Sequence, residues 1–174
     1  MTRLFTALPL PDAAADHLAG QLADRLPTTP SGLRLIPREQ WHITVGFYGE
    51  DDPNQRAARL HERVKNLRAP RLSLAGSGTF SGVCWVGVDT GGPALGALAE
   101  AADAAAGGHA RYTPHLTVAR CPKGSPLAEG MARALGDYRG PEWTAGELVL
   151  FRSELGSAGP VYTPVDQVRL RTTG

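Results

Sequence analysis

The sequence predicts an α+β protein with two similar lobes, and two observations lead to this fold class. Segments with the apolar alternation of β-strands interleave with segments whose apolar residues recur at helical spacing. In addition, the motif His42-Ile43-Thr44-Val45 recurs as His115-Leu116-Thr117-Val118, 73 residues later. Because a strand–helix–strand rhythm surrounds both copies, we expect one two-lobed domain over residues 1–174, each lobe contributing one motif strand.

Strands and helices alternate through the first part of the chain. Residues 3–8 suit a strand that prolines end. Apolar residues at every fourth position then predict an amphipathic helix: Ala14, Leu18, Leu22 and Leu26. A short strand is expected over residues 32–36, before the first motif strand over residues 41–48, which should end at Gly49. A second helix follows the acidic turn, with its apolar face at Ala57, Leu60, Val64 and Leu67.

The second part of the chain repeats this alternation. Residues 71–75 and 83–88 are expected to form paired strands joined by a Gly/Ser-rich turn over residues 76–82. An alanine-rich helix over residues 93–106 should end at two glycines, ahead of the second motif strand over residues 112–120. The remaining expected elements are a short helix containing Leu127, Met131 and Leu135, and closing strands over residues 143–151 and 161–171.

Composition excludes several classes of protein. Hydrophobic residues make up 42% of the chain and charged residues 20%, as in globular domains. A net charge of +1 argues against a protein that coats long nucleic acids, which usually carries a basic stripe. No segment approaches the roughly 20 apolar residues that span a bilayer. Cys84 and Cys121 are too few for a disulfide framework, which indicates reduced thiols in a cytoplasm. We therefore expect a soluble, cytoplasmic protein without contact to membranes, and a monomer because no heptad pattern or exposed apolar stripe demands a partner.

The repeated motif has the residues needed for phosphate chemistry. On a β-strand, alternate side chains share a face, so each motif presents a histidine and a threonine on one side and two apolar anchors on the other. Two imidazoles can act as general base and general acid in one displacement. The hydroxyls of Thr44 and Thr117 can donate hydrogen bonds to phosphate oxygens. This chemistry needs neither a metal nor a cofactor.

Other interpretations of these histidines are weaker. A single His-x-Thr-x pattern is most often a surface or satisfied interior histidine, but two copies with the same alternation favour a shared site. A zinc site fits poorly, because His17, His61 and His109 lack the spacing of metal ligands. The chain also lacks the Gly-x-Ser-x-Gly turn of a serine hydrolase.

These motifs resemble the 2H phosphoesterase superfamily, and within it the bacterial and archaeal RNA 2′,3′-cyclic phosphodiesterases, also called 2′-5′ RNA ligases. The similar segments cover most of the chain: Arg3-Leu4-Phe5, Ala7-Leu8-Pro9, residues 42–49, residues 76–80, Trp85-Val86-Gly87-Val88, residues 114–120, Ser153-Glu154-Leu155 and residues 159–162. The resemblance implies two antiparallel sheets that face each other across a central cleft, related by a pseudo-two-fold axis, with helices outside. It also implies that each motif lies on a central strand of its lobe.

The resemblance further implies roles for the motif residues. His42 would be the proton donor to the leaving 3′ oxygen, and His115 the proton acceptor that activates water. Thr44 and Thr117 would bind the phosphate. The substrate would be an RNA 3′ end or a nucleotide with a 2′,3′-cyclic phosphate, and the product would carry a 2′-phosphate.

Alignment of the two motifs adds Phe47 and Arg120, which stand five residues after the two histidines. Arg120 is expected to bind phosphate, and the two side chains could sandwich the terminal base. Strict alternation would point both into the core, so the second strand should end, twist or bulge before Arg120. Phe47 has no such constraint, and core packing remains the alternative for it.

Two alternatives to hydrolysis remain open. The same site could join RNA ends through a 2′-5′ linkage, since microscopic reversibility permits the reverse reaction. A noncatalytic cleft that binds RNA ends or nucleotides is the other alternative, although phosphate binding alone would be served as well by Lys or Arg.

Overall fold

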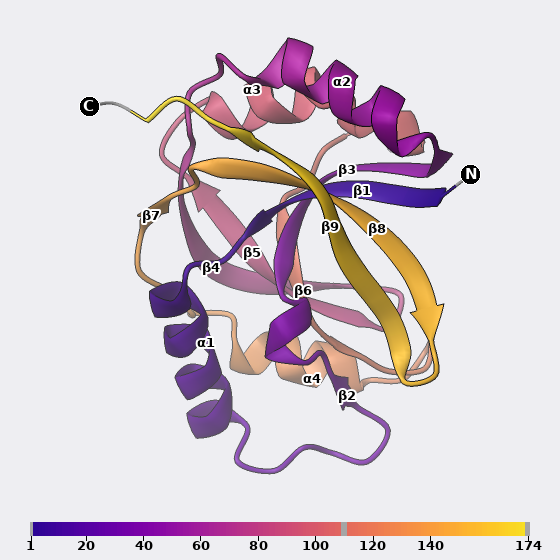
Figure 1. Cartoon of the computed structure of the whole chain (residues 1–174). Coiled ribbons are helices and arrows are strands. Elements are labelled where there is room, and N and C mark those ends of the chain that lie inside the picture. Colours follow the sequence, from indigo (N-terminus) through magenta and orange to yellow (C-terminus); the bar gives the residue numbers. More distant parts are fainter. Residues whose placement is uncertain (1, 109–110, 173–174) are drawn as a thin grey trace.

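The computed structural model describes residues 2–108 and 111–172, so His109 lies outside the described residues. Figure 1 shows an α+β fold of two antiparallel sheets with helices around them, which confirms the expected fold class. The strands are β1 (Thr2–Pro9), β2 (Arg34–Leu35), β3 (His42–Asp51), β4 (Arg71–Phe80), β5 (Val83–Thr90), β6 (His115–Arg120), β7 (Trp143–Thr144), β8 (Glu147–Gly156) and β9 (Gly159–Arg169). The helices are α1 (Asp12–Arg25), α2 (Pro53–Val64), α3 (Ala94–Ala101) and α4 (Leu127–Ala134), with short 3-10 turns η1 (Arg38–Gln40) and η2 (Ala104–Gly107).

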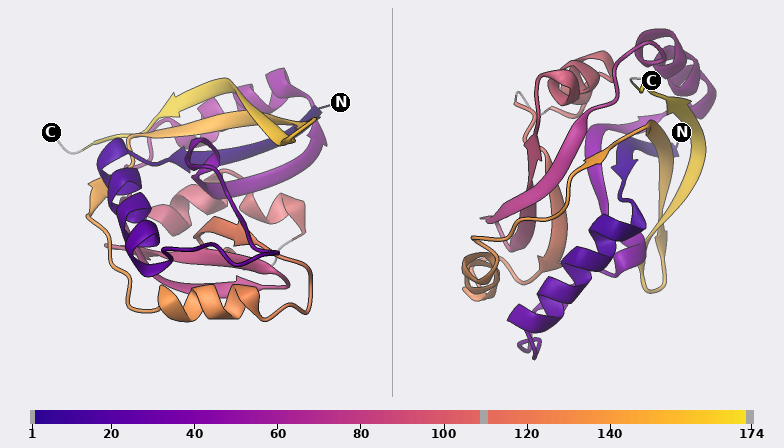
Figure 2. Two further views of the ribbon diagram at one scale, coloured as in Figure 1. Left: turned by 90° about the horizontal axis from the view of Figure 1, so that it is seen from below. Right: turned by 90° about the vertical axis from the view of Figure 1, so that its left-hand side faces the viewer.

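The two sheets draw strands from both halves of the chain. The first sheet has the order β3-β1-β8-β9, and the second sheet has the order β2-β6-β5-β4-β7. Thus β4 precedes the middle of the chain but pairs with β5 and β7, whereas β8 returns from the C-terminal part to pair with β1. Figure 2 shows the sheets as two layers, with α4 on the outer side of the second. The lobes are therefore interlaced rather than consecutive in sequence.

The two motif strands occupy different places in their sheets. Strand β6 has paired neighbours on both sides, β2 and β5, as expected for a central strand. Strand β3 is an edge strand, so the expectation of a central position is wrong for the first motif. Turn η2 contacts β3, and a Cβ built on Gly107 would lie 2.6 Å from the carbonyl oxygen of Phe47. This close approach covers part of the exposed edge and needs a glycine.

A β-bulge interrupts the first motif strand just after its threonine. Thr44 and Gly46 pair with neighbouring residues of β1, which leaves Val45 as the extra residue. The hydroxyl of Thr6, which is fully buried, accepts a hydrogen bond of 3.1 Å from the N–H of Gly46. After the bulge the alternation reverses, so Phe47 is 43% exposed instead of packed in the core. The core-packing alternative for Phe47 is therefore wrong.

The second motif strand has the same irregularity. Thr117 and Ala119 pair with neighbouring residues of β5, which leaves Val118 as the extra residue. Val118 and Ala119 are both buried, and Arg120 is exposed. The expected bulge before Arg120 is confirmed, and it turns the guanidinium away from the core.

Two expected elements are split by tertiary contacts. The helix expected over residues 93–106 breaks at Asp103, which has φ +54° and forms ion pairs with Arg56, Arg59 and Arg63 of α2. These ion pairs outweigh the helix preference of the alanines around Asp103. The strand expected over residues 143–151 breaks after β7, where the chain leaves the second sheet and enters the first as β8.

Several strand boundaries also differ from expectation, including those of the last strand, β9, which runs over Gly159–Arg169 instead of residues 161–171. Strand β3 continues to Asp51, two residues beyond Gly49. Strand β4 continues through residues 76–80, where a turn was expected, because a bulge near Gly76 (φ +68°) keeps it paired with β5. The second motif strand begins at His115 rather than at residue 112. No helix within residues 2–108 and 111–172 is long and apolar enough to cross a membrane.

Candidate active site

The two histidines begin their strands and are held in the same way. Nδ1 of His42 donates a hydrogen bond of 2.7 Å to the carbonyl oxygen of Gln40, and Nδ1 of His115 donates one of 2.8 Å to that of Thr113. A carbonyl oxygen can only accept, so the proton must be on Nδ1 in both rings. Each imidazole therefore keeps its Nε2 available to accept or donate a proton.

The fold brings the two motif strands together, as the sequence predicts. Strands β3 and β6 contact each other although they belong to different sheets. The segment before each motif also contacts the other motif. The Tyr112 hydroxyl donates a hydrogen bond of 2.8 Å to the carbonyl oxygen of Thr44, and the N–H of Ile36 donates one of 2.9 Å to that of Val118.

The electrostatics of His42 reflect its surroundings. Burial lowers the pKa of His42 below its ordinary value of 6.5, the hydrogen bond to Gln40 opposes this shift, and the charge of His115 lowers the pKa further.

Aromatic rings fix the orientation of His42. Its ring lies 5.1 Å from that of Phe5 and 5.3 Å from that of Tyr162, which it meets edge to face. Phe5 also stacks on Phe151 at 5.2 Å. These contacts come from β1, β8 and β9, so the whole first sheet supports this imidazole.

His115 has a similar aromatic frame in the second sheet. Its ring lies 5.2 Å from that of Phe80, edge to face, and 6.0 Å from that of Trp85. A Cβ on Gly78 would lie 2.2 Å from the Trp85 ring, so the indole lies directly over that glycine. Gly78 is therefore required for the placement of Trp85.

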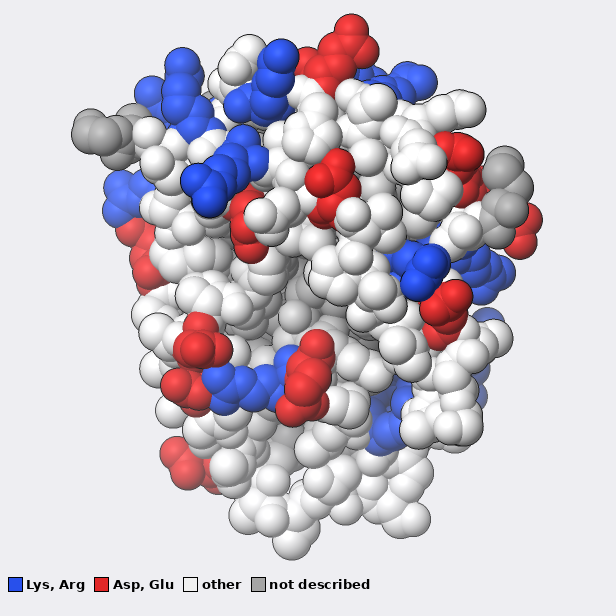
Figure 3. Space-filling model, in the orientation of Figure 1, with Lys and Arg blue, Asp and Glu red and all other residues white. Residues whose placement is uncertain are grey.

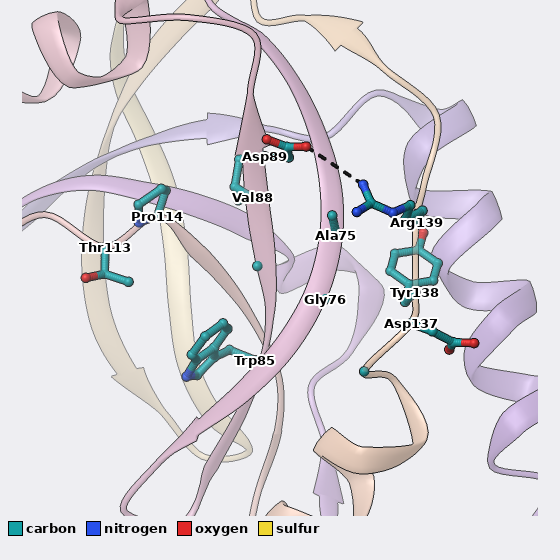
Figure 4. A pocket seen from close by; sticks show the side chains of 12 residues that line it. Ala75, Gly76, Trp85, Val88, Asp89, Thr113, Pro114, Asp137, Tyr138 and Arg139 are labelled. Atoms are coloured by element: carbon teal, nitrogen blue, oxygen red, sulfur yellow. Dashed lines mark ion pairs between the residues drawn. The ribbon is translucent and has the colours of Figure 1, made fainter.

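A cavity of about 670 Å³ is lined by Trp85 and by Thr113 and Pro114, the two residues before His115. Figure 4 shows Trp85, Thr113 and Pro114 on one side of it, and the ion pair of Asp89 with Arg139, at 3.9 Å, on another. Because Thr113 anchors the ring of His115 and Trp85 packs against it, the second histidine lies beside this open depression.

The remaining predicted residues lie along the same strands. Thr44 and Thr117 are half-buried, and their hydroxyls make no hydrogen bond with any described residue. Each is two residues from its histidine and shares its face of the strand. The two hydroxyls are therefore available to an incoming anion.

The other histidines within the described part of the chain have ordinary roles. Nδ1 of His17 forms a hydrogen bond of 3.0 Å with the hydroxyl of Tyr138, and Nε2 of His61 lies 2.9 Å from the carboxylate of Asp166. Across residues 2–108 and 111–172, no group of three or more His, Cys, Asp or Glu side chains is placed to hold a metal ion.

Sequence reasoning missed the aromatic frames and the Tyr112 bridge. The rings of Phe5 and Trp85 reach the histidines because β1 and β5 pair with the motif strands. Aromatic residues on the neighbouring strands were the available signal, but this signal can be used only when it is known which strands pair with the motif strands.

Comparisons with known proteins agree with this architecture. Residues 5–157 match the 2′-5′ RNA ligase superfamily. A Methanothermobacter thermautotrophicus protein named RNA 2′,3′-cyclic phosphodiesterase is 29% identical over 97% of this chain and 98% of its own length. A Thermus thermophilus protein with the same name is 29% identical over 97% of this chain and 90% of its own.

Solved structures show the same fold. A Thermus thermophilus crystal structure matches with a TM-score of 0.74 and 27% identity, covering 99% of this chain and 100% of the other. Escherichia coli LigT, solved in complex with ATP, matches with a TM-score of 0.76 and 23% identity over 97% of this chain and 98% of the other. The chain therefore belongs to the 2′-5′ RNA ligase superfamily.

Proposed function

We propose that this protein is a metal-independent enzyme that hydrolyses RNA or nucleotide 2′,3′-cyclic phosphates to 2′-phosphate ends. The observation that carries the proposal is the matched anchoring of His42 and His115, which leaves two Nε2 atoms free on contacting strands. The names of the curated relatives support the same reaction and the same RNA substrate.

Each imidazole transfers one proton in the proposed reaction. Nε2 of His115 takes a proton from water as its oxygen attacks phosphorus. The bond between phosphorus and the 3′ oxygen breaks, and that oxygen takes a proton from Nε2 of His42. The ester bond to the 2′ oxygen remains, which yields a 2′-phosphate. The assignment of donor and acceptor follows the family resemblance, since the two anchoring hydrogen bonds are alike.

Substrate binding prepares His42 for its role as donor. In the free protein, burial keeps the pKa of His42 low, so the neutral form dominates at neutral pH. The negative charge of a bound phosphodiester favours the protonated ring. We infer that binding of the anionic substrate is coupled to proton uptake at His42.

The other predicted residues bind the substrate in this proposal. The unpartnered hydroxyls of Thr44 and Thr117 donate to nonbridging oxygens, where negative charge develops in the transition state. Arg120, exposed after its bulge, supplies positive charge for phosphate. Phe47 offers an exposed ring on which the terminal base stacks. Basic and acidic side chains are interspersed on the face seen in Figure 3, which suits recognition of an RNA end better than of a long tract.

The protein is also proposed to work as a monomer in the cytoplasm. Cys84 and Cys121 are both free thiols, which suits a reducing compartment. Light scattering of the purified protein tests the monomer directly.

Incubation with an oligonucleotide ending in a 2′,3′-cyclic phosphate, in the presence of EDTA, tests the proposed activity. We expect complete conversion to the 2′-phosphate. Binding without turnover across a wide pH range would instead indicate a noncatalytic binder. Joined products from RNA halves with a 5′-hydroxyl, in excess over hydrolysis, would favour ligation.

A further inference from the structure

Two arginines face each other at one end of the site. Arg34 of β2 pairs directly with Arg120 of β6 in antiparallel register. Directly opposed residues of an antiparallel pair project to the same face, with Cβ atoms about 5 Å apart. Both residues are exposed. The guanidinium of Arg34 therefore extends the positive charge of Arg120 across the edge of the second sheet.

This arrangement is unfavourable without an anion. Like charges directly opposite each other in a sheet destabilise the pair. Neither arginine takes part in an ion pair or side-chain hydrogen bond with another described residue, whereas Arg38, Arg56 and Arg59 each pair with an aspartate. The turn between β8 and β9 lies beside Arg34, since a Cβ on Gly159 would be 3.8 Å from a terminal nitrogen of that arginine.

The internal repeat shows that the positive charge of Arg34 and Arg120 has no counterpart at the equivalent place on the first motif strand. Moved by the 73 residues that separate the two histidines, Arg34 corresponds to Gly107 and Arg120 corresponds to Phe47. Gly107 and Phe47 are also in contact, at the equivalent place on the first motif strand. One end of the site thus carries two cations, and its counterpart carries an exposed phenylalanine whose backbone lies against a glycine.

We propose that Arg34 and Arg120 together bind the phosphodiester on the 5′ side of the terminal nucleotide, so that the enzyme prefers RNA ends to free cyclic mononucleotides. The inference rests on the proposed function, because it assumes that the cyclic phosphate lies between the two histidines. Arg120 is three residues beyond Thr117, about 10 Å along the strand. Two guanidiniums at that distance suit a second phosphate, which a cyclic mononucleotide lacks.

Comparison of two substrates that differ by this phosphodiester tests the inference. These are adenosine 2′,3′-cyclic phosphate and the dinucleotide ApA ending in a 2′,3′-cyclic phosphate. We expect Arg34→Gln to lower kcat/KM about tenfold on the dinucleotide and to leave the mononucleotide within about twofold, with Arg34→Lys intermediate. The salt dependence of kcat/KM on the dinucleotide should also weaken, by about 0.7 in the logarithmic slope.

Arg133→Gln is the matched control, because Arg133 is an exposed arginine of α4, on the outer side of the second sheet. It should leave both substrates unchanged. Equal losses on both substrates with Arg34→Gln, or no loss on the dinucleotide, would overturn the inference. Thermal melting checks the fold, and we expect Arg34→Gln to melt no lower than wild type, because it removes a like-charge contact.

Binding separates this inference from the proposed activity. The dissociation constants of adenosine 2′-phosphate and of ApA ending in a 2′-phosphate can be measured without turnover. Arg34→Gln should weaken only the dinucleotide product. If the protein hydrolyses neither cyclic substrate but shows this selective loss of binding, the proposed function fails and the phosphodiester site stands. If binding of both products is unchanged, the site is refuted whatever the activity.

Discussion

Replacement of Tyr112 by Phe tests whether the contact between the two motif strands controls catalysis. Tyr112 is half-buried, and desolvation raises the pKa of its phenol well above the ordinary value. The hydroxyl donates a hydrogen bond of 2.8 Å to the carbonyl oxygen of Thr44. Tyr112→Phe removes this donor and leaves that carbonyl without it. The free energy of unfolding should therefore fall by about 1 to 2 kcal/mol. For a chain of 174 residues, this corresponds to a fall in Tm of roughly 3 to 6 °C.

The effect on catalysis should be larger than the effect on binding. Tyr112 stands three residues before His115 and contacts the strand that carries His42, so its hydrogen bond helps to set the separation of the two imidazoles. Small misplacements of catalytic groups can cost up to about 100-fold in rate. We expect kcat on a cyclic-phosphate substrate to fall about tenfold, with KM changed by less than about twofold.

Tyr138→Phe provides the matched control. Tyr138 is fully buried, and its hydroxyl likewise makes one side-chain hydrogen bond, of 3.0 Å to His17, but it contacts neither motif strand through that hydroxyl. It should lower the Tm by a similar amount and leave kcat unchanged. If Tyr112→Phe lowers the Tm as calculated but keeps wild-type kcat, the contact is structural only, and the reasoning on histidine separation is refuted.

Three further predictions concern Thr117, His42 and Phe47. Thr117→Val should lower kcat about 100-fold because it removes a donor to the transition state, whereas Thr117→Ser should retain most activity; equal activity of both variants in steady-state kinetics would contradict this. Burial lowers the pKa of His42 in the folded chain below the ordinary 6.5, so the unfolded chain binds more protons at this histidine as the pH falls. The neutral side chain of His42 therefore contributes stability above pH 6.5, and this stability is lost as the pH falls through the folded pKa. Between pH 7 and pH 5, the Tm of wild type should therefore fall more steeply than that of His42→Gln, and parallel curves in scanning calorimetry would argue against the burial effect. Phe47→Leu should raise KM for an adenine-ended substrate about tenfold through lost stacking, and an unchanged KM would exclude stacking on this ring.

Local patterns predicted the parts of the site that depend on neighbouring residues. Alternation placed His115 and Thr117 on one face and buried Leu116 and Val118 on the other, as observed. The repeat of the motif also indicated correctly that the two copies meet, because strands β3 and β6 are in contact. These inferences needed only the two-residue period of a strand and an internal repeat.

Features that depend on pairing between distant strands could not be predicted in this way. The bulge at Val45 arises in the register with β1, where Thr6 supplies a buried hydroxyl, and it reverses the face of Phe47. The opposition of Arg34 and Arg120 likewise exists only because β2 pairs with β6. A one-residue shift moves every later side chain to the other face of the sheet, so short-range patterns lose their meaning there.

The most direct test of paired-histidine catalysis is the rate of 2′-phosphate formation by wild type, His42→Ala and His115→Ala on one cyclic-phosphate oligonucleotide in EDTA. General acid–base catalysis contributes about 10² to 10⁴-fold, so each variant should lose at least about 100-fold in kcat while melting as a folded protein. Wild-type activity should persist in EDTA. Full activity in either variant, or loss of wild-type activity on chelation that added metal restores, would contradict a metal-independent mechanism that depends on both imidazoles.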